Sequence, residues 1–296
     1  MSRGLTVRAA AKINLHLGVG APREDGFHPL ETVYQAISLY DDVTLAPGAG
    51  VQVDGADGLD VSGVPRDDSN IAARAVRLVL DAAGAEESLA IHLHKTIPVA
   101  GGMAGGSADG AAALLAADRV LGAGLSDERL LALAAELGSD VPFALLGGTA
   151  LGTGRGELVQ PLADAGAWWW VVVPSAEGLS TPAVYRHWDR LFPEASPTPP
   201  SSQSLQDALA SGDSARLAGV LHNDLQAAAV DLRPDLADLL ARGESEGALR
   251  GLVSGSGPTC VFLCAGAEEA RAVAAALDTT LVAHGPVAGA HVVESV

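Results

Sequence analysis

The residues most able to do chemistry together lie in the stretch 98–109, PVAGGMAGGSAD. An alternating segment typical of a strand precedes this glycine-rich loop, and an alanine-rich run typical of a helix follows it. Loop amides and a helix N-terminus together attract an anion, and glycine lets the backbone approach it closely. In such a site Ser107 would add a hydroxyl, and Asp109 would reach a cation beside a phosphate. The alternative is a turn that only packs the helix tightly.

The loop fits neither of the two commonest phosphate-binding classes. A Walker A loop needs G-x-x-x-x-G-K-[ST], but no lysine follows Gly106. The dinucleotide fingerprint G-x-G-x-x-G needs a spacing that Gly102, Gly105 and Gly106 do not have. An oxidoreductase with a dinucleotide-binding fold is therefore disfavoured.

The only two lysines, Lys12 and Lys95, lie where a point charge could be used. All the other basic residues are arginines, so lysine is the exception in this chain. Lysine offers a compact ammonium where arginine offers a flat fork. Lys12 shares the polar face of an alternating segment with Asn14 and His16, and Lys95 precedes the glycine-rich loop. Chance is the alternative explanation.

Composition bounds the class of protein. A length of 296 residues favours two domains, and 48% apolar residues suffice for a sizeable core. The formal net charge of −18 argues against a nucleic-acid partner, although local amides can still hold a phosphate. Neither a signal peptide nor a long apolar span is present, and Cys260 and Cys264 fit free thiols. We expect a cytoplasmic monomer or homodimer.

The elements that must position these residues mix strands and helices without an internal repeat. Alternating segments predict strands over 7–20, 28–45 and 88–98, and a buried strand over 168–173 opens a second domain. Turns and short edge strands are expected over 46–69, and a hairpin over 149–162. Helices are expected over 71–83, 108–121, 127–137, 139–148 and 267–277 and from about 204, 215 and 234, with a strand after 251 and a last one over 289–296. This order favours an α+β fold.

Several motifs, in order along the chain, resemble those of the GHMP kinases, the superfamily of galactokinase, homoserine kinase, mevalonate kinase and phosphomevalonate kinase. PVAGGMAGGSAD resembles their ATP-phosphate loop, with Met103 in place of a leucine and Ala108 in place of a second serine. LVSGSGPTCVFL resembles their third motif. AKINLHLGVGAPREDGFHPLETV and GSDVPFALLGGTALGTGRGE resemble motifs of one branch, so the resemblance covers nearly the whole chain.

The resemblance implies a two-domain α+β GHMP kinase fold. Residues 1–165 would form a ribosomal S5 domain 2-like N-terminal domain with the phosphate loop and catalytic residues, and residues 166–296 a ferredoxin-like C-terminal domain. The implied cofactors are ATP and Mg²⁺, with no protein ligand of the metal identified. Members of the branch transfer the ATP γ-phosphoryl group to the 2-hydroxyl of a small-molecule substrate, a methylerythritol that carries a cytidine diphosphate, in non-mevalonate isoprenoid synthesis.

The resemblance also implies roles for individual residues. Lys12 would polarise the hydroxyl and Asp140 would be the base, although a helix N-cap is the local alternative for Asp140. Phe27 and Tyr185 would stack on the cytosine, and His28 would bond its edge. The other implied residues bind substrate (Asn14), hold ATP (Asn70, Lys95, Pro98, Gly101, Gly102, Gly105, Gly106 and Ser107) or close the site from the second domain (Gly255, Ser256 and Gly257). No role follows for Asn223 and Asp224.

Two alternatives stay open at this point. One is another GHMP small-molecule kinase, for mevalonate, homoserine or a sugar; the segment DGFHPLETV, which would recognise a cytosine, counts against it. The other is a non-catalytic regulator that binds nucleotide, and the presence of both Lys12 and Asp140 counts against that.

Overall fold

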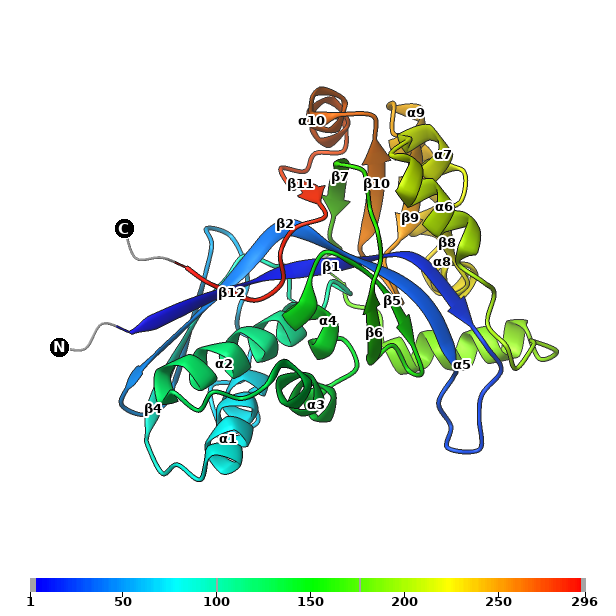
Figure 1. Ribbon diagram of the computed structural model, residues 1–296. Coiled ribbons are helices and arrows are strands. Elements are labelled where there is room, and N and C mark those ends of the chain that lie inside the picture. The colour runs from blue at the N-terminus through cyan, green and yellow to red at the C-terminus, as the bar shows by residue number, and fades with distance from the viewer. Residues whose placement is uncertain (1–3, 100, 176, 294–296) are drawn as a thin grey trace.

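Two long strands, β1 (Leu5–Val19) and β2 (Leu30–Pro47), run across the whole molecule (Figure 1). The computed structural model describes residues 4–99, 101–175 and 177–293, and within them these two strands pair antiparallel in an eight-stranded sheet. Its order is β12-β1-β2-β4-β3, with β5 beside β2, β6 beside β5 and β8 beside β1. The other strands are β3 (Val51–Gly55), β4 (Leu89–Lys95), β5 (Thr149–Thr153), β6 (Leu158–Pro161), β8 (His222–Asn223) and β12 (His291–Val292).

In the described part of the chain, four helices cover one face of this sheet: α1 (Ile71–Ala83), α2 (Gly105–Leu121), α3 (Asp127–Leu137) and α4 (Val141–Leu146). The central one is α2, whose alanines are buried against β1, β2 and α1. Alanine lets these elements approach closely and has the highest helix propensity, so an alanine-rich helix suits the centre of the layer. The N-terminus of α2 is thereby fixed next to the middle of β1.

A second sheet stands on the other side of β1 and β2 (Figure 1). In the described chain it has the order β11-β7-β10-β9, with every neighbouring pair antiparallel. When these four strands are numbered 1 to 4 along the chain, their order in the sheet is 4-1-3-2, the ferredoxin-like arrangement that the resemblance implied. Its strands are β7 (Trp168–Val173), β9 (Arg250–Val253), β10 (Cys260–Cys264) and β11 (Val282–Gly285). The helices of this half are α5 (Thr181–Leu191), α6 (Gln203–Ser211), α7 (Ser214–Ala218), α8 (Leu225–Leu232), α9 (Asp235–Ser245) and α10 (Ala267–Ala276).

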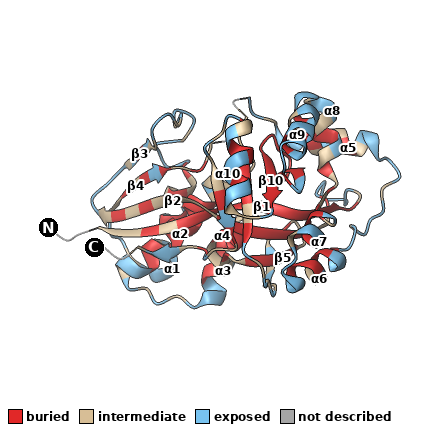
Figure 2. Cartoon of the chain, turned by 90° about the horizontal axis from the view of Figure 1, so that it is seen from above, coloured by how far each residue is buried: buried red, intermediate tan, exposed pale blue. Residues whose placement is uncertain are grey.

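The two sheets share one apolar core through the alternating faces of β7. Trp168, Trp170 and Val172 belong to the cluster that also contains the first sheet, whereas Val171 packs with the helices of the second half. The Trp170 indole also donates a hydrogen bond of 2.9 Å to Gln35 Oε1 on β2. Buried residues accordingly run through both sheets, while exposed residues lie on the outer sides of the helices (Figure 2). The expected domain boundary after residue 165 falls just before β7 and stays a prediction.

Some expected elements differ from those observed. The helix expected to begin at residue 108 begins at Gly105, inside the glycine-rich loop. Helices α5 and α8 and strand β11 were not predicted from the sequence, and the last strand is shortened to His291–Val292 within the described residues. Helix α5 begins at a Thr-Pro pair, and proline in a first helical turn is easily taken for a loop. No helix of the described chain is long and apolar enough to cross a membrane.

Candidate active site

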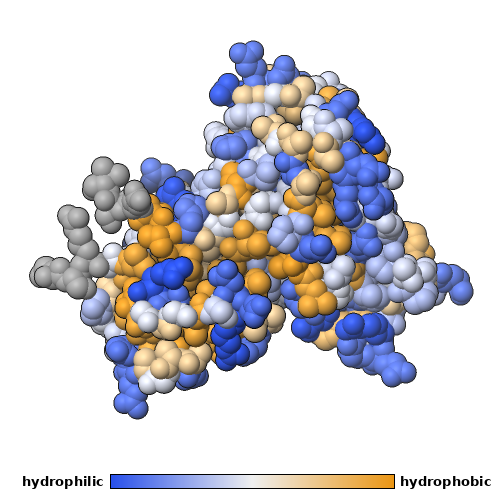
Figure 3. Space-filling model, viewed as in Figure 1, coloured by the Kyte–Doolittle hydropathy of each residue, from blue (hydrophilic) through white to orange (hydrophobic). Residues whose placement is uncertain are grey.

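A cavity of about 600 Å³ lies where the two halves of the chain meet. Strand β1, the loop before α2, helix α5 and the loop after β9 all contribute to its wall. The wall includes most of the residues singled out from the sequence: Lys12, Asn14, Asn70, Lys95, Pro98, Gly101, Gly102, Gly105, Gly106, Asp140, Tyr185, Gly255, Ser256 and Gly257. Phe27, His28 and Ser107 lie outside it. On the face seen in Figure 3, hydrophilic residues dominate the outer ends, and apolar residues reach the surface across the middle.

The glycine-rich loop ends in a helix N-terminus that has no side-chain cap. Ala104 occupies the N-cap position of α2 with φ 57°, in the left-handed region, and its methyl group cannot accept a hydrogen bond from the amides of the first turn. The first-turn residues Gly105 and Gly106 line the cavity, so their amides stay available to a ligand there. Ser107 follows in the same turn, outside the wall. This end of a 17-residue helix is electrostatically suited to an anion.

A second glycine loop closes against the first. Gly102 has φ +76°, and a Cβ there would lie only 2.8 Å from the carbonyl oxygen of Gly257, so only glycine fits this contact. The Asn223 amide donates hydrogen bonds of 2.8 Å to the carbonyl oxygens of Val253 and Gly255. The asparagine of the HNDLQ motif therefore fixes the second loop, a role that the sequence left open. Asp224 in turn accepts a hydrogen bond of 2.8 Å from the backbone of Val19.

Lys12 and Asp140 lie next to each other in the cavity wall. Lys12 Nζ lies 3.5 Å from Asp140 Oδ2 and donates a hydrogen bond of 2.8 Å to Asn14 Oδ1. The Asn14 amide donates to Thr32 Oγ1 at 2.8 Å, which fixes its orientation. Asn14 was expected to bind substrate; it lines the cavity, and its contact with Lys12 orients the lysine. The alternation of β1 brings Lys12 and Asn14 to the same face.

The carboxylate of Asp140 does not cap its helix. Asp140 stands at the N-cap of α4, yet its side chain makes no capping hydrogen bond. Instead Oδ1 accepts a hydrogen bond of 3.1 Å from the hydroxyl of Tyr34 on β2. Burial and the nearby Asp140 raise the pKa of Tyr34 well above its usual value, so this hydroxyl remains a donor. One carboxylate oxygen is held by Tyr34, and the other faces Lys12.

Tyr34 is a site residue that sequence reasoning missed. Its hydroxyl lies so close to Gly156 that a Cβ there would be 2.2 Å away, and a Cβ on Gly152 would be 2.6 Å from the Tyr34 ring. The glycines of the motif GTGRGE therefore make room for Tyr34. The motif was visible in the sequence, but its partner lies more than a hundred residues away along the chain.

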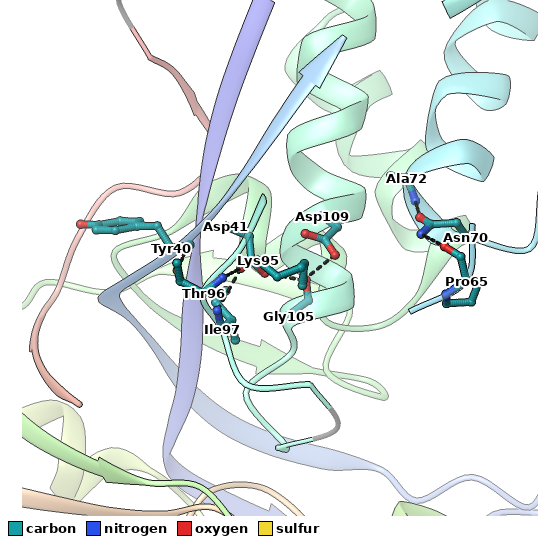
Figure 4. A network of polar contacts seen from close by, with 10 residues as sticks. All are labelled: Tyr40, Asp41, Pro65, Asn70, Ala72, Lys95, Thr96, Ile97, Gly105 and Asp109. Atoms are coloured by element: carbon teal, nitrogen blue, oxygen red, sulfur yellow. Dashed lines mark hydrogen bonds and ion pairs between the residues drawn. The ribbon is translucent and has the colours of Figure 1, made fainter. Parts of the chain in front are cut away.

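Lys95 lies in a buried ion cluster (Figure 4). Its ammonium contacts the carboxylates of Asp41 and Asp109, the latter at 2.6 Å. Burial lowers the pKa of Lys95, but the attraction of Asp109 and Asp41 outweighs it and the net direction is upward. Burial raises the pKa of Asp109 to about 7, with Asp41 adding to the rise and Lys95 opposing it. Lys95 thus lines the cavity with its charge already compensated.

Asn70 was expected to help hold ATP, and its amide is bonded within its own turn (Figure 4). Its Oδ1 accepts from the backbone of Ala72 at 2.8 Å, which caps α1, and its Nδ2 donates to the carbonyl oxygen of Pro65 at 2.7 Å. The side chain is buried and forms part of the cavity wall. Its observed contacts shape the 65–70 turn that borders the cavity.

At the opposite end, aromatic side chains gather around His28. The His28 ring lies 4.9 Å from that of Tyr185 and 5.6 Å from that of Trp188. The ring Nδ1 is 2.8 Å from the Gly20 carbonyl oxygen and therefore carries the proton as donor. His28 is buried behind Tyr185, whereas Phe27 is 49% exposed. Tyr185 therefore lines the cavity and also packs against His28, which lies outside the cavity wall.

No group of three or more His, Cys, Asp or Glu side chains in the described residues could hold a metal ion by itself. One oxygen nevertheless fits a hard cation. Asp109 Oδ1 is buried and has no hydrogen-bond partner in the described chain, and Asp109 lines the cavity one turn into α2. Mg²⁺ is usually bound by one or two carboxylates together with phosphates and water, so a single carboxylate is compatible with Mg²⁺.

Known proteins share both halves of this arrangement. Residues 70–148 match the GHMP kinases N terminal domain, and residues 205–283 match the GHMP kinases C terminal domain. The chain belongs to the GHMP kinases, and the two-domain α+β fold expected from its motifs is confirmed.

Its relatives define the branch. A protein from Nocardioides sp. (strain JS614) named 4-diphosphocytidyl-2-C-methyl-D-erythritol kinase is 63% identical, with 97% of this chain and 99% of the relative covered. A protein of the same name from Thermobifida fusca is 54% identical over 98% of each chain. A crystal structure of 4-(cytidine 5'-diphospho)-2C-methyl-D-erythritol kinase superposes with a TM-score of 0.78 at 34% identity, covering 94% of this chain and 98% of that one. Within the superfamily the chain is therefore in the 4-diphosphocytidyl-2-C-methyl-D-erythritol kinase family, as DGFHPLETV predicted.

Proposed function

We propose that this enzyme transfers the γ-phosphoryl group of ATP to the 2-hydroxyl of 4-diphosphocytidyl-2-C-methyl-D-erythritol, a step of non-mevalonate isoprenoid synthesis. The observation that carries the proposal is the position of Lys12 and Asp140 in the same cavity wall as the free N-terminus of α2. Phosphoryl transfer depends on positioning and charge stabilisation, and this cavity offers a phosphate site and a proton acceptor together. The names of the relatives support the choice of acceptor.

The phosphates of ATP would lie on the two glycine loops. The amides of Gly105 and Gly106 and the helix dipole of α2 would hold them from one side, and Gly255 to Gly257 would cover them from the other. Mg²⁺, when bound, would neutralise part of the phosphate charge, and Asp109 Oδ1 is the protein oxygen that would hold it.

At the reacting end, Asp140 would accept the proton of the acceptor hydroxyl. The hydroxyl oxygen forms the new bond to the γ-phosphorus as the bond to the ADP oxygen breaks, and the proton goes to Asp140 Oδ2. Lys12 would polarise the hydroxyl and stabilise the negative charge that develops on its oxygen. Asn14 and Tyr34 would keep these two groups in place through the bonds described above.

At the cytosine end, Tyr185 lines the cavity, and the exposed ring of Phe27 lies 5.0 Å from the guanidinium carbon of Arg155, which also lines it. His28 was expected to bond the edge of the cytosine, but it lies outside the cavity wall and its Nδ1 bonds the Gly20 carbonyl oxygen, so we assign it the role of supporting Tyr185. We further infer a small-molecule kinase of the cytoplasm that works as a monomer or homodimer.

The test is ATP consumption by the purified protein with Mg²⁺, offered 4-diphosphocytidyl-2-C-methyl-D-erythritol, mevalonate, homoserine and galactose in parallel. We expect turnover with the cytidine compound alone. Turnover with a different acceptor would overturn the substrate assignment but would leave the assignment of kinase activity in place. ATP binding without turnover of any acceptor would favour a regulator.

A further inference from the structure

The cavity wall contains few positive charges for the two highly charged molecules that it would hold. Among the described residues, the cationic side chains in the wall are those of Lys12, Lys95 and Arg155. Lys12 faces Asp140, and Lys95 is paired with two buried carboxylates. The whole protein carries a formal charge of −18, so a second phosphate-bearing ligand needs local compensation. Arg155 is therefore the cationic residue of this wall to which no role has yet been assigned.

The guanidinium of Arg155 is held loosely. The backbone N–H of Arg155 donates to Glu157 Oε2 at 2.6 Å, which fixes the turn between β5 and β6. Its side-chain Nε forms an ion pair with Glu157 Oε1 at 3.6 Å, too long for a hydrogen bond, and within the described chain the guanidinium donates no hydrogen bond. The side chain is 39% exposed. Its donors are thus free for a ligand, while its position is defined by the turn.

The turn that carries Arg155 contacts both ends of the proposed acceptor site. Toward the cytosine end, the guanidinium carbon lies 5.0 Å from the centre of the Phe27 ring. The carbonyl oxygen of Gly154 accepts a hydrogen bond of 2.8 Å from Leu30, which fixes the turn to the start of β2. Toward the reacting end, Gly156 lies against the hydroxyl of Tyr34, which bonds Asp140. Arg155 lies between the group that would stack on the base and the groups that would act on the alcohol.

We propose that Arg155 binds the diphosphate of the acceptor substrate and thereby selects an acceptor that carries one. The inference rests on the proposed function, in which the diphosphate of the acceptor lies between its cytosine base and the alcohol that is phosphorylated. A guanidinium presents several N–H donors in a plane, which matches phosphate oxygens and suits bidentate binding. Stacking on Phe27 leaves these in-plane donors free.

The test compares two ligands that differ only in the diphosphate: CDP and cytidine. Arg155→Met keeps an unbranched apolar stem over Phe27 but removes the charge and the donors. We expect the dissociation constant of CDP, measured by calorimetry, to rise about tenfold or more, because hydrogen bonds to a charged group are lost. The dissociation constant of cytidine should change less than about twofold. In turnover assays the KM for the acceptor should rise by a factor similar to that of the CDP dissociation constant, and the KM for ATP should stay unchanged.

The matched control is Arg23→Met. Arg23 is exposed to a similar degree, 42%, lies on the neighbouring 23–27 loop and pairs with Asp25, but it does not line the cavity. The Arg23→Met variant should leave the dissociation constants of CDP and cytidine unchanged. The Arg155→Lys variant should recover part of the CDP affinity that Arg155→Met loses.

Three results would overturn the proposal. Equal weakening of CDP and cytidine would mean that Arg155 acts only by packing on Phe27. A rise confined to the KM for ATP would assign it to the nucleotide phosphates. Unchanged CDP binding, or no CDP binding by the unaltered protein, would remove the subsite. Because the binding measurement needs no turnover, failure of the proposed reaction would be seen separately in the acceptor assay.

Discussion

The two lysines of this chain contribute to the same cavity wall and have opposite surroundings. Lys12 on β1 faces one carboxylate, that of Asp140, at 3.5 Å, and Asp140 is 31% exposed. Lys95 at the end of β4 contacts two carboxylates, those of Asp41 and Asp109, which are 0% and 4% exposed. The first pair is open to a ligand, and the second is closed within the protein. From this comparison we predict that Lys12 contacts a ligand in the cavity, whereas Lys95 acts within the protein.

The difference comes from which partners the fold supplies. Asp41 accepts from the backbone of Thr96 at 2.7 Å and of Ile97 at 2.9 Å as well as from Lys95, so it joins β2 to the strand end that leads into the glycine loop. The Lys95 cluster therefore fixes the start of that loop. Lys12 is held by Asn14 alone on its own strand, which leaves its ammonium facing the cavity.

The largest expected effect is on catalysis at the open pair. Lys12→Met should lower kcat by about 10²–10³, because charge on the reacting oxygen loses its stabilising cation. Stability and ATP affinity should change little, since the partner Asp140 remains partly solvated. Steady-state kinetics, thermal melting and ATP calorimetry check the three parts. A variant that keeps full turnover would remove Lys12 from the mechanism.

The reverse pattern is expected at the closed cluster. Lys95→Met leaves two buried carboxylates without their cation, and breaking a buried pair in this way costs about 3–5 kcal/mol in the free energy of unfolding. Urea unfolding of this variant and of Lys12→Met, side by side, measures the contrast. If Lys95→Met were as stable as the unaltered protein yet failed to bind ATP, Lys95 would be a nucleotide ligand after all.

A third prediction concerns pH. Since burial raises the pKa of Asp109 to about 7, the folded protein binds a proton there that unfolded aspartate, with a pKa of about 4, has lost. This group therefore favours folding below about pH 4 to 5, and its contribution is lost as the pH rises to about 7. Asp109→Asn cannot titrate, so its Tm relative to the unaltered protein should rise by about 2–4 °C between pH 5 and pH 8. A difference in Tm that is independent of pH would contradict the raised pKa.

The smallest expected effect is at Tyr34. Tyr34→Phe removes the hydrogen bond to Asp140 Oδ1 but keeps the ring beneath Lys12, 5.4 Å from its ammonium. We expect kcat to fall by about threefold to tenfold with no change in the KM for ATP, as for loss of one ordinary hydrogen bond worth about 0.5–1.5 kcal/mol. Tyr40→Phe serves as control, because Tyr40 packs under Arg8 away from the cavity. An equal effect of both variants would mean a general loss of packing.

The sequence was most informative where function depends on backbone or on neighbours along the chain. The glycine loop, the alternation that pairs Lys12 with Asn14, and most helices follow from local patterns. Tyr34, Asn223 and Arg155 could not be found in this way, because the groups that they contact (Asp140, the 253–255 loop and Phe27) are not their neighbours along the chain. Asn70 shows the converse: a motif places it at the nucleotide site, but only the structure reveals that its amide is bonded to its own turn.

The outer edge of β1 is completed late in the chain. Strands β8 and β12, from the C-terminal half, pair with β1 at His16–Leu17 and at Val7–Arg8. An N-terminal fragment that ends before β7 would expose this edge of a long, largely apolar strand. Unpaired edges of this kind recruit strands from other molecules, so such a fragment would be prone to aggregate. By covering this edge, the second half of the protein also protects the strand that carries Lys12 from pairing with other molecules.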